Sequence, residues 1–317
     1  MKGGVYVRYF DLHCDTMTEC AEKEIPLRKN HLHVDLDTAK DWAHYVQCYA
    51  VWLPDNLRGE AAWQRFLQVA GRFSEEIEKN QDCLSRLCAP GDLDHLEKQG
   101  RHGAILTVES GAALGGKLEH IQDFQRLGVR MCTLTWNGAT ELGRGVMAPG
   151  DTGLTEFGRQ AVKAMEQAGI LIDLSHASPE LFWDVVEIGE RPLVASHSNA
   201  KEICGHPRNL TKEQFEAIRK SGGLVGLNFY KAFLNDQPEK ASMEDVLRHA
   251  EYFLALGGED VLAMGGDWDG ADLPEDMPGL SSIPKLYELF LQHYPEHLVD
   301  KIFYGNAARV FREQKLL

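Results

Sequence analysis

His13 and Asp15 are two potential metal ligands separated by a single residue, and they follow a short run of β-branched and aromatic residues that begins at Val5. Such a run predicts a strand. In an extended chain, residues two apart point to the same face, so the imidazole and the carboxylate project together. The pair alone fits either a metal site or an ordinary turn with a solvated aspartate, and the rest of the chain must distinguish the two.

Potential ligands or bases also stand at the ends of four further predicted strands, as Glu109, His176, His197 and Asp267. One such residue would more often be structural, but the same coincidence at five strand ends is hard to explain in that way. The carboxyl ends of the strands in a parallel barrel meet at one mouth, where catalytic residues gather. The sequence therefore predicts a metal site at such a mouth.

The ligand types favour zinc. Three imidazoles with two or three carboxylates suit Zn²⁺ and its first-row neighbours, whereas oxygen-only sets suit Mg²⁺ or Ca²⁺. One catalytic zinc usually takes about three protein ligands, fewer than the candidates in this chain. Two ions roughly 3.5–4 Å apart, with a shared water or hydroxide, fit better. Glu109 comes from a strand between those of the histidines, so we expect it to bridge the two ions.

Apolar runs rich in β-branched and aromatic residues alternate with helical segments along the chain. This alternation predicts a (β/α)8 TIM barrel. A doubly wound sheet is the alternative, but it usually carries a glycine-rich phosphate-binding turn after its first strand, where this chain has His-Cys-Asp. The eight predicted strands are Val5–Leu12, Tyr45–Trp52, Gly103–Val108, Val129–Thr135, Ile170–Ser175, Leu193–Ser196, Gly223–Phe229 and Val261–Gly266.

The length of 317 residues suits one large barrel, and we expect residues 1–317 to form a single domain. The net charge of −15 argues against nucleic acid and anionic membranes as partners. The chain has no apolar run of about 18 residues, which a membrane-spanning helix needs. Seven scattered cysteines without a CxxC motif indicate a reducing compartment. The first residues lack the apolar core of a signal peptide, so we expect a cytoplasmic protein.

The motifs around the candidate ligands, taken in order, resemble the membrane dipeptidase (renal dipeptidase) family, a branch of the amidohydrolase-like metal barrels. The His-x-Asp pair is itself discriminating, because many other amidohydrolases have His-x-His in the first strand. The resemblance runs from about residue 10 to residue 311, which is nearly the whole chain. The matching stretches are Asp11–Asp15, Val108–Gly111, Leu171–His176, Ser196–Ser198, Pro207–Leu210, Val225–Tyr230, Gly265–Gly270 and Gly305–Ala307.

This resemblance implies a barrel enzyme with two zinc ions that hydrolyses dipeptides, often those with a D-residue at the C-terminal position. It implies that His13 and Asp15 hold one zinc ion and that His176 and His197 hold the other. Glu109 would bridge the two ions. A hydroxide shared by the ions would then attack the peptide carbonyl.

The resemblance also assigns roles to two residues beyond the metal ligands. Asp267 would be the acid and base, taking a proton from the attacking water and giving it to the leaving amine. Arg208 matches the family's arginine that binds the terminal carboxylate of the substrate, which a planar guanidinium can do bidentately. Because family members often form homodimers, we expect one here.

One position departs from the family. Animal members have a His after the fourth strand that contacts the substrate, and this chain has Trp136 there. Trp136 or Asn137 can still donate a hydrogen bond, and we expect both residues, together with Tyr230, to contact the substrate. The departure leaves open another amidohydrolase reaction on the same metals, with a lactone, a phosphoester or an N-acyl amino acid. A metal-binding barrel without activity is a third alternative.

Overall fold

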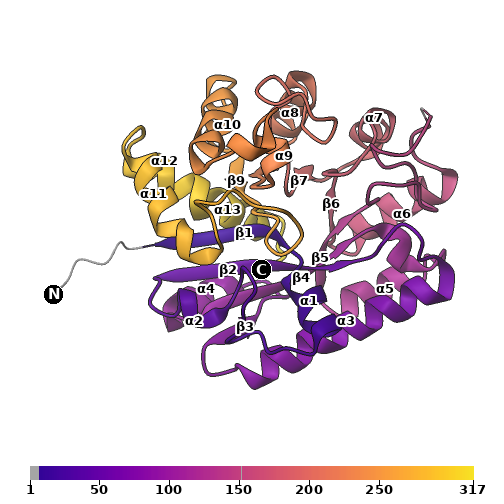
Figure 1. Cartoon of the computed structure of the whole chain (residues 1–317). Helices are drawn as coiled ribbons and strands as arrows, with labels where there is room; N and C mark the ends of the chain where they lie inside the picture. The colour runs from indigo at the N-terminus through magenta and orange to yellow at the C-terminus, as the bar shows by residue number, and fades with distance from the viewer. Residues whose placement is uncertain (1–6, 151) are drawn as a thin grey trace.

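Eight parallel strands pair edge to edge in a closed ring, and helices surround the ring (Figure 1). The structure is a computed structural model that describes residues 7–150 and 152–317. The ring runs β2-β1-β9-β8-β7-β6-β5-β4 and closes where β4 pairs with β2. The predicted (β/α)8 barrel is therefore confirmed. Its strands are β1 (Arg8–Cys14), β2 (His44–Trp52), β4 (His102–Glu109), β5 (Val129–Thr133), β6 (Leu171–Asp173), β7 (Val194–Ala195), β8 (Leu224–Leu227) and β9 (Leu262–Met264).

The strands β5 to β9 end earlier than the sequence predicted. The reason is that, at the mouth of the barrel, side chains accept backbone hydrogen bonds in place of the neighbouring strand. Asp173, for example, ends β6 by accepting hydrogen bonds from the backbone N–H groups of Ser175 and Ser196. The first predicted strand includes Val5 and Tyr6, which lie outside the described residues.

In the described residues, four short α-helices and one short strand escaped prediction, because each is too short to show a clear hydrophobic period. The strand β3 pairs only with the first residues of β4 and stands outside the ring. The helix α1 begins directly after Asp15 and so lies beside the mouth. These elements are β3 (Leu84–Arg86), α1 (Thr16–Lys23), α2 (Leu36–Ala39), α4 (Asp92–Gln99) and α9 (Lys231–Leu234).

The other helices follow the strands, and most of them cover the outside of the ring. Thr211 and Gln214 form a capping box at the start of α8, where each side chain accepts the backbone N–H of the other residue. The helical pattern near the C-terminus is interrupted by a π-helical segment, Lys301–Gly305. The helices are α3 (Gly59–Lys79), α5 (His120–Arg126), α6 (Glu156–Gln167), α7 (Pro179–Ile188), α8 (Lys212–Lys220), α10 (Met243–Ala255), α11 (Ile283–Leu291), α12 (Glu296–Asp300) and α13 (Asn306–Glu313).

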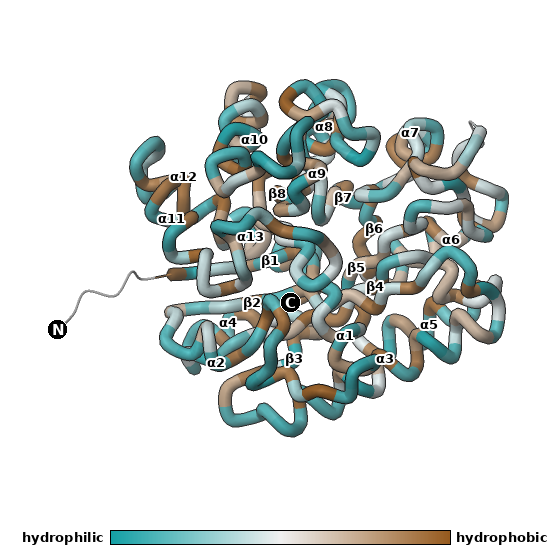
Figure 2. Tube along the Cα trace, in the orientation of Figure 1, coloured by the Kyte–Doolittle hydropathy of each residue, from teal (hydrophilic) through white to brown (hydrophobic). Residues whose placement is uncertain are grey.

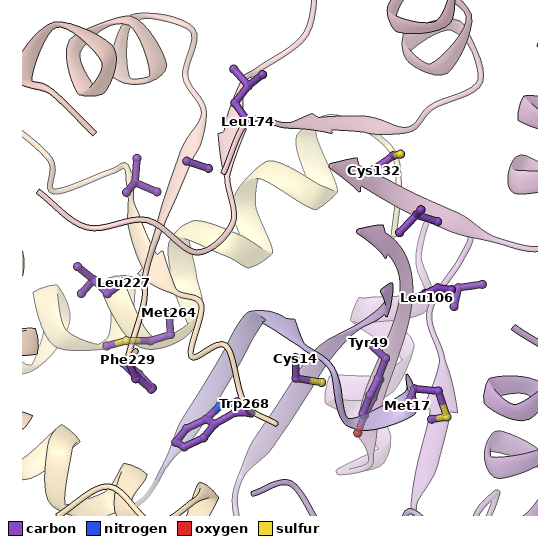
Figure 3. Packing of buried hydrophobic residues seen from close by; sticks show 14 of the residues in the cluster. Cys14, Met17, Tyr49, Leu106, Cys132, Leu174, Leu227, Phe229, Met264 and Trp268 are labelled. Atoms are coloured by element: carbon purple, nitrogen blue, oxygen red, sulfur yellow. The ribbon is translucent and has the colours of Figure 1, made fainter. Parts of the chain in front are cut away.

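Apolar side chains form two layers on the two faces of the strands. The inner layer fills the ring and includes Phe10 and Leu12 of β1 and Ile105 of β4. The outer layer lies between the ring and its helices, and Figure 3 shows part of it, including Cys14 and Trp268. Figure 2 shows the hydrophobic colour along much of the strands and the hydrophilic colour on many outer turns. Because both faces are covered, the strands read as continuous apolar runs in the sequence.

The C-terminal helix closes the N-terminal end of the ring. α13 packs against β1, β8 and β9. The ring of Phe311 lies 5.4 Å from the ring of Phe10, centroid to centroid, and Leu316 and Leu317 beyond the helix are buried in the same cluster. Apolar side chains therefore fill this end of the barrel, and the opposite end carries the polar residues.

Replacing Phe311 with Ala is expected to lower the free energy of unfolding by about 3–5 kcal/mol, because the fully buried ring would leave a cavity. Urea titration followed by circular dichroism measures this change. The control is Leu67→Ala on α3, where the side chain is 36% exposed and the expected loss is about 0.5 kcal/mol. Equal small losses in both variants would show that α13 does not help to pack the barrel.

The cysteines contribute to packing and form no disulfide in the structure. All seven are free, and five of them are buried. Buried free thiols behave as small apolar side chains. Within residues 7–150 and 152–317, no helix has both the length and the apolar character needed to cross a bilayer.

Candidate metal centre

Glu109 lies at the centre of the predicted ligands at the C-terminal end of the ring. Its Oε1 atom is 2.8 Å from Nε2 of His176 and 3.7 Å from Nε2 of His197. Its Oε2 atom is 3.5 Å from Nε2 of His13. One ligand group consists of His13, His197 and Asp267, and two further groups form around Glu109, one of His13, Asp15 and Glu109 and one of Glu109, His176 and His197. Within each group the ligand atoms lie within 4.8 Å of one another. The two groups share Glu109, which turns one oxygen to each.

A β-bulge brings His13 to the mouth of the barrel. Leu12 belongs to the inner layer, yet Cys14, two residues on, belongs to the outer layer. The pairing of β1 with β2 shifts register between Asp11 and Cys14, which accounts for this change of face. Asp15 is not extended, with φ −97° and ψ 6°. His13 and Asp15 do lie close together, as predicted. The bulge and the turn at Asp15 bring them together, and the predicted alternation of a regular strand does not.

The ligand atoms are arranged to receive a positive ion. Nε2 of His13 and Oδ1 of Asp15 are buried and have no hydrogen-bond partner in the described part of the chain. Nε2 of His176 faces Nε2 of His197 at 3.0 Å. Buried polar atoms are normally partnered, so these atoms fit a bound cation. Mixed imidazole and carboxylate donors suit zinc and its neighbours.

Burial and neighbouring charges set the protonation of the ligands. Burial lowers the pKa of His176 to about 4, with Arg208 contributing, and burial also holds the pKa of His197 well below its ordinary value. Both imidazoles are therefore neutral at pH 7, the form that binds a metal. Burial raises the pKa of Asp15 to about 7, and the negative charge of Glu109 adds to this. A cation held between Asp15 and Glu109 favours the ionised form of both carboxylates.

The second ring nitrogen of each of two histidines is held by a neighbour. Nδ1 of His197 is 2.8 Å from the hydroxyl of Ser196, which donates in turn to Asp173 at 2.6 Å. Nδ1 of His176 is 3.1 Å from Oδ1 of Asn137. These contacts fix both rings with Nε2 toward the centre of the site. Asn137, expected as a substrate contact, lines the pocket but also orients a ligand.

Replacing Ser196 with Ala is expected to weaken metal binding by about 10–100-fold, because the ring of His197 loses its hydrogen-bond partner. Competition with a chromophoric chelator measures the affinity. Ser198→Ala is the matched control, since the hydroxyl of Ser198 is buried and has no partner among the described residues. Equal metal affinity in the wild type and both variants would contradict the orienting role of Ser196.

Asp11 is a buried carboxylate beside the site, and no role was predicted for it from the sequence. The sequence feature that could have indicated a role is a charged residue inside an apolar strand. It links the ends of β1 and β9, which carry His13 and Asp267, and burial raises its pKa. Its hydrogen-bond donors are the backbone N–H groups of His13 and Gly266, the side chains of Gln47 and Trp268, and the hydroxyl of Tyr9.

Asp267 stands at the mouth in a left-handed backbone conformation, with φ 58°. Its Oδ1 atom is 3.7 Å from Nε2 of His13, and its Oδ2 atom accepts a hydrogen bond of 3.0 Å from Asn228. Burial raises the pKa of Asp267, and a positive charge on His13 opposes this rise. Asp269 fixes the same loop by accepting a hydrogen bond of 2.5 Å from Thr16. A carboxylate held in this way can exchange a proton with a group bound over the ligands.

A pocket of about 610 Å³ opens above the ligands. Arg208 lines it and is 4% exposed, yet no guanidinium nitrogen has a hydrogen-bond partner among the described residues. Burial lowers the pKa of Arg208 to about 10. Because a buried cation without hydrogen-bond partners is unfavourable, this arrangement fits an anionic group of a ligand. Trp136 and Tyr230 also line the pocket, together with Phe233, which the sequence argument did not single out.

Residues 5–317 match the family model of membrane dipeptidases (peptidase family M19). The chain belongs to this family. The "uncharacterized protein in pqqA 5'region" of Klebsiella pneumoniae is 35% identical over 260 residues, which are 79% of this chain and 94% of that protein. Dipeptidase 3 of Mus musculus is 28% identical over 279 residues, which are 82% of this chain and 56% of the mouse protein.

A solved structure of a metallo peptidase from Rhodobacter sphaeroides supports the same assignment. It is liganded with a phosphinate mimic of the dipeptide L-Ala-D-Ala. The two folds agree with a TM-score of 0.91 at 27% identity, over 98% of this chain and 99% of the other. The resemblance inferred from the motifs is thus confirmed, and this membrane dipeptidase family member is a metal-dependent hydrolase of the dipeptidase type.

Proposed function

We propose that this protein is a dipeptidase with two zinc ions. His13 and Asp15 hold one ion, and His176 and His197 hold the other. Glu109 ligates both ions. The observation that carries this proposal is the position of Glu109, whose two oxygens face two separate ligand groups. A carboxylate in that position suits two ions roughly 3.5–4 Å apart.

Asp267 is the proton carrier in the proposed reaction. When bound, the zinc ions supply a shared water of lowered pKa and polarise the carbonyl of the scissile bond. Asp267 accepts the proton of the attacking water and gives it to the leaving amine. Its hydrogen bond from Asn228 keeps the carboxylate turned toward His13, and burial keeps bulk water from competing for the proton.

Arg208 selects substrates that end in a carboxylate. In a dipeptide the C-terminal carboxylate lies only one residue from the peptide bond that is cut. One arginine beside the metal ligands can therefore recognise the dipeptide by its length as well as by its charge. The mimic of L-Ala-D-Ala bound to the Rhodobacter relative has this length.

Hydrolysis of a substrate panel by the zinc-loaded protein tests the proposal. The panel holds L-Xaa-L-Xaa and L-Xaa-D-Xaa dipeptides, their C-terminal amides, a lactone and a phosphoester. We expect turnover of free dipeptides, with kcat/KM lower by about 100-fold for the amides because these leave Arg208 unpaired. Turnover of the lactone or the phosphoester without any dipeptide would favour another amidohydrolase reaction. Full zinc content without turnover of any substrate would favour a barrel without activity.

We also propose that the protein works on small molecules in a reducing compartment such as the cytoplasm. The seven free cysteines and the net charge of −15 support this proposal. The homodimer implied by the family resemblance stays a prediction. Light scattering of the purified protein measures the oligomeric state.

A further inference from the structure

Trp52 and Trp136 stand side by side at the rim of the pocket, on the two sides of the strand that carries Glu109. Trp52 is the last residue of β2 and is the register partner of Glu109 in β4. Trp136 follows β5, which pairs with the other edge of β4. The two indole rings meet edge to face, with centroids 5.1 Å apart and planes at 82°. Both side chains line the pocket, and we call them together the tryptophan wall.

Trp52 lies across the mouth from Arg208, and Trp136 lies on the arc between them, since β5 is two strands from both β2 and β7. Arg208 follows β7, and β7 is four strands from β2 in either direction around the ring. Residues that follow β2 and β7 therefore face each other from opposite sides of the barrel. The metal ligands lie between these two sides, since they come from β1, β4 and the turns after β6 and β7.

This placement fixes the direction in which a substrate runs. The step rests on the proposed function, because it uses the binding of a carboxylate by Arg208. A dipeptide whose carboxylate lies on Arg208 and whose peptide bond lies over the ligands extends its N-terminal residue toward Trp52. Glu19 of α1, the helix that follows the neighbouring strand β1, also lines the pocket. Its carboxylate, which also pairs with Lys23, has the charge that suits the ammonium group of that residue.

We propose that the tryptophan wall binds the side chain of the substrate's N-terminal residue and selects large apolar and aromatic side chains there. Two indoles packed edge to face offer a broad apolar surface of defined shape. Each indole has a single N–H donor and no acceptor, so a polar side chain finds few partners. A glycine at the same position leaves that apolar surface uncovered.

The backbone holds the tryptophan wall in place. The backbone N–H of Trp52 donates a hydrogen bond of 3.1 Å to the hydroxyl of Thr18. Gly145 packs so closely on Trp136 that a Cβ at this glycine would lie 2.1 Å from the carbonyl oxygen of Trp136. These contacts fix the backbone that carries the two indoles, and the indoles pack against each other. The wall is therefore formed before a substrate binds, which lowers the cost of ordering it.

Kinetics with paired dipeptides test the proposal. The measured quantity is the ratio of kcat/KM for Phe-Ala to kcat/KM for Gly-Ala, with the stereoisomer that the enzyme cuts faster. In the wild type we expect a ratio of about tenfold or more. The ratio should fall toward one in Trp52→Ala and in Trp136→Ala. The control is Trp183→Ala on α7, whose side chain is 43% exposed, and it should keep the wild-type ratio.

An unchanged ratio of Phe-Ala to Gly-Ala in both variants would overturn the inference. The ratio of Gly-Phe to Gly-Ala reports the C-terminal residue, and a change that appears only in this second ratio would also overturn the inference. Should Trp52→Ala fail to fold, Trp52→Leu and Trp136→Ala give the same reading. If the enzyme hydrolyses dipeptides but shows no preference for the N-terminal side chain, this inference is wrong and the proposed function still stands. Absence of turnover with every dipeptide overturns the proposed function itself.

Discussion

Replacing Asp267 with Asn is expected to lower kcat for dipeptide hydrolysis by about 10²–10⁴-fold, while the zinc content stays at two per chain. The amide keeps the shape of the side chain but cannot take a proton from water and return it to the amine. Steady-state kinetics give kcat, and atomic emission of the same sample gives the metal content. Both values are needed, because Asp267 also lies within reach of His13 and His197.

The same variant has a distinct result if Asp267 is a metal ligand instead. In that case Asp267→Asn would lose zinc, and added zinc would restore part of the rate. Glu275→Gln is the matched control, since Glu275 lies in the same loop, is exposed and does not line the pocket. We expect this control to keep both kcat and zinc. A normal kcat in Asp267→Asn would contradict its role as the proton carrier.

Replacing Arg208 with Met is expected to lower kcat/KM for free dipeptides by about 100-fold or more, because two charge-assisted hydrogen bonds to the carboxylate are lost. Amide-capped dipeptides lack that carboxylate, so the same change should alter their kcat/KM far less. The free energy of unfolding should stay the same or rise, since Met removes a buried charge that has no hydrogen-bond partner among the described residues.

Comparing free with amide-capped dipeptides shows whether Arg208 binds the substrate carboxylate, and a stability measurement shows whether it supports the fold. An equal loss of activity on free and capped dipeptides would show that Arg208 does not meet the carboxylate. A clear fall in stability on urea titration would show that the guanidinium supports the fold. Arg208→Lys keeps the charge but not the planar fork, and we expect it to recover only part of the lost activity.

The barrel and the ligands could be predicted because each signal is local. A strand covered on both faces is a continuous apolar run, and the site begins where a polar residue ends that run. Asp173 and His176 after Leu171 show this pattern clearly. The same pattern recurs at five strand ends, and the barrel geometry then brings those ends together.

The parts that escaped prediction depend on partners far apart in the chain. The bulge that turns His13 to the mouth arises from the pairing of β1 with β2, and no residue type marks it. Ser196 is an ordinary serine until its hydroxyl is seen between Asp173 and His197. Trp52 reads as the end of an apolar strand, and only the ring order places it across from Arg208.

The most direct test of the proposed two-ion site is a zinc titration of metal-free protein, with dipeptide hydrolysis measured after each addition. The two ligand groups that share Glu109 predict that the rate reaches its plateau at two zinc ions per chain. Glu109→Gln should bind zinc more weakly and stay far below that plateau. Full activity at one zinc ion per chain, or without any metal, would contradict the account.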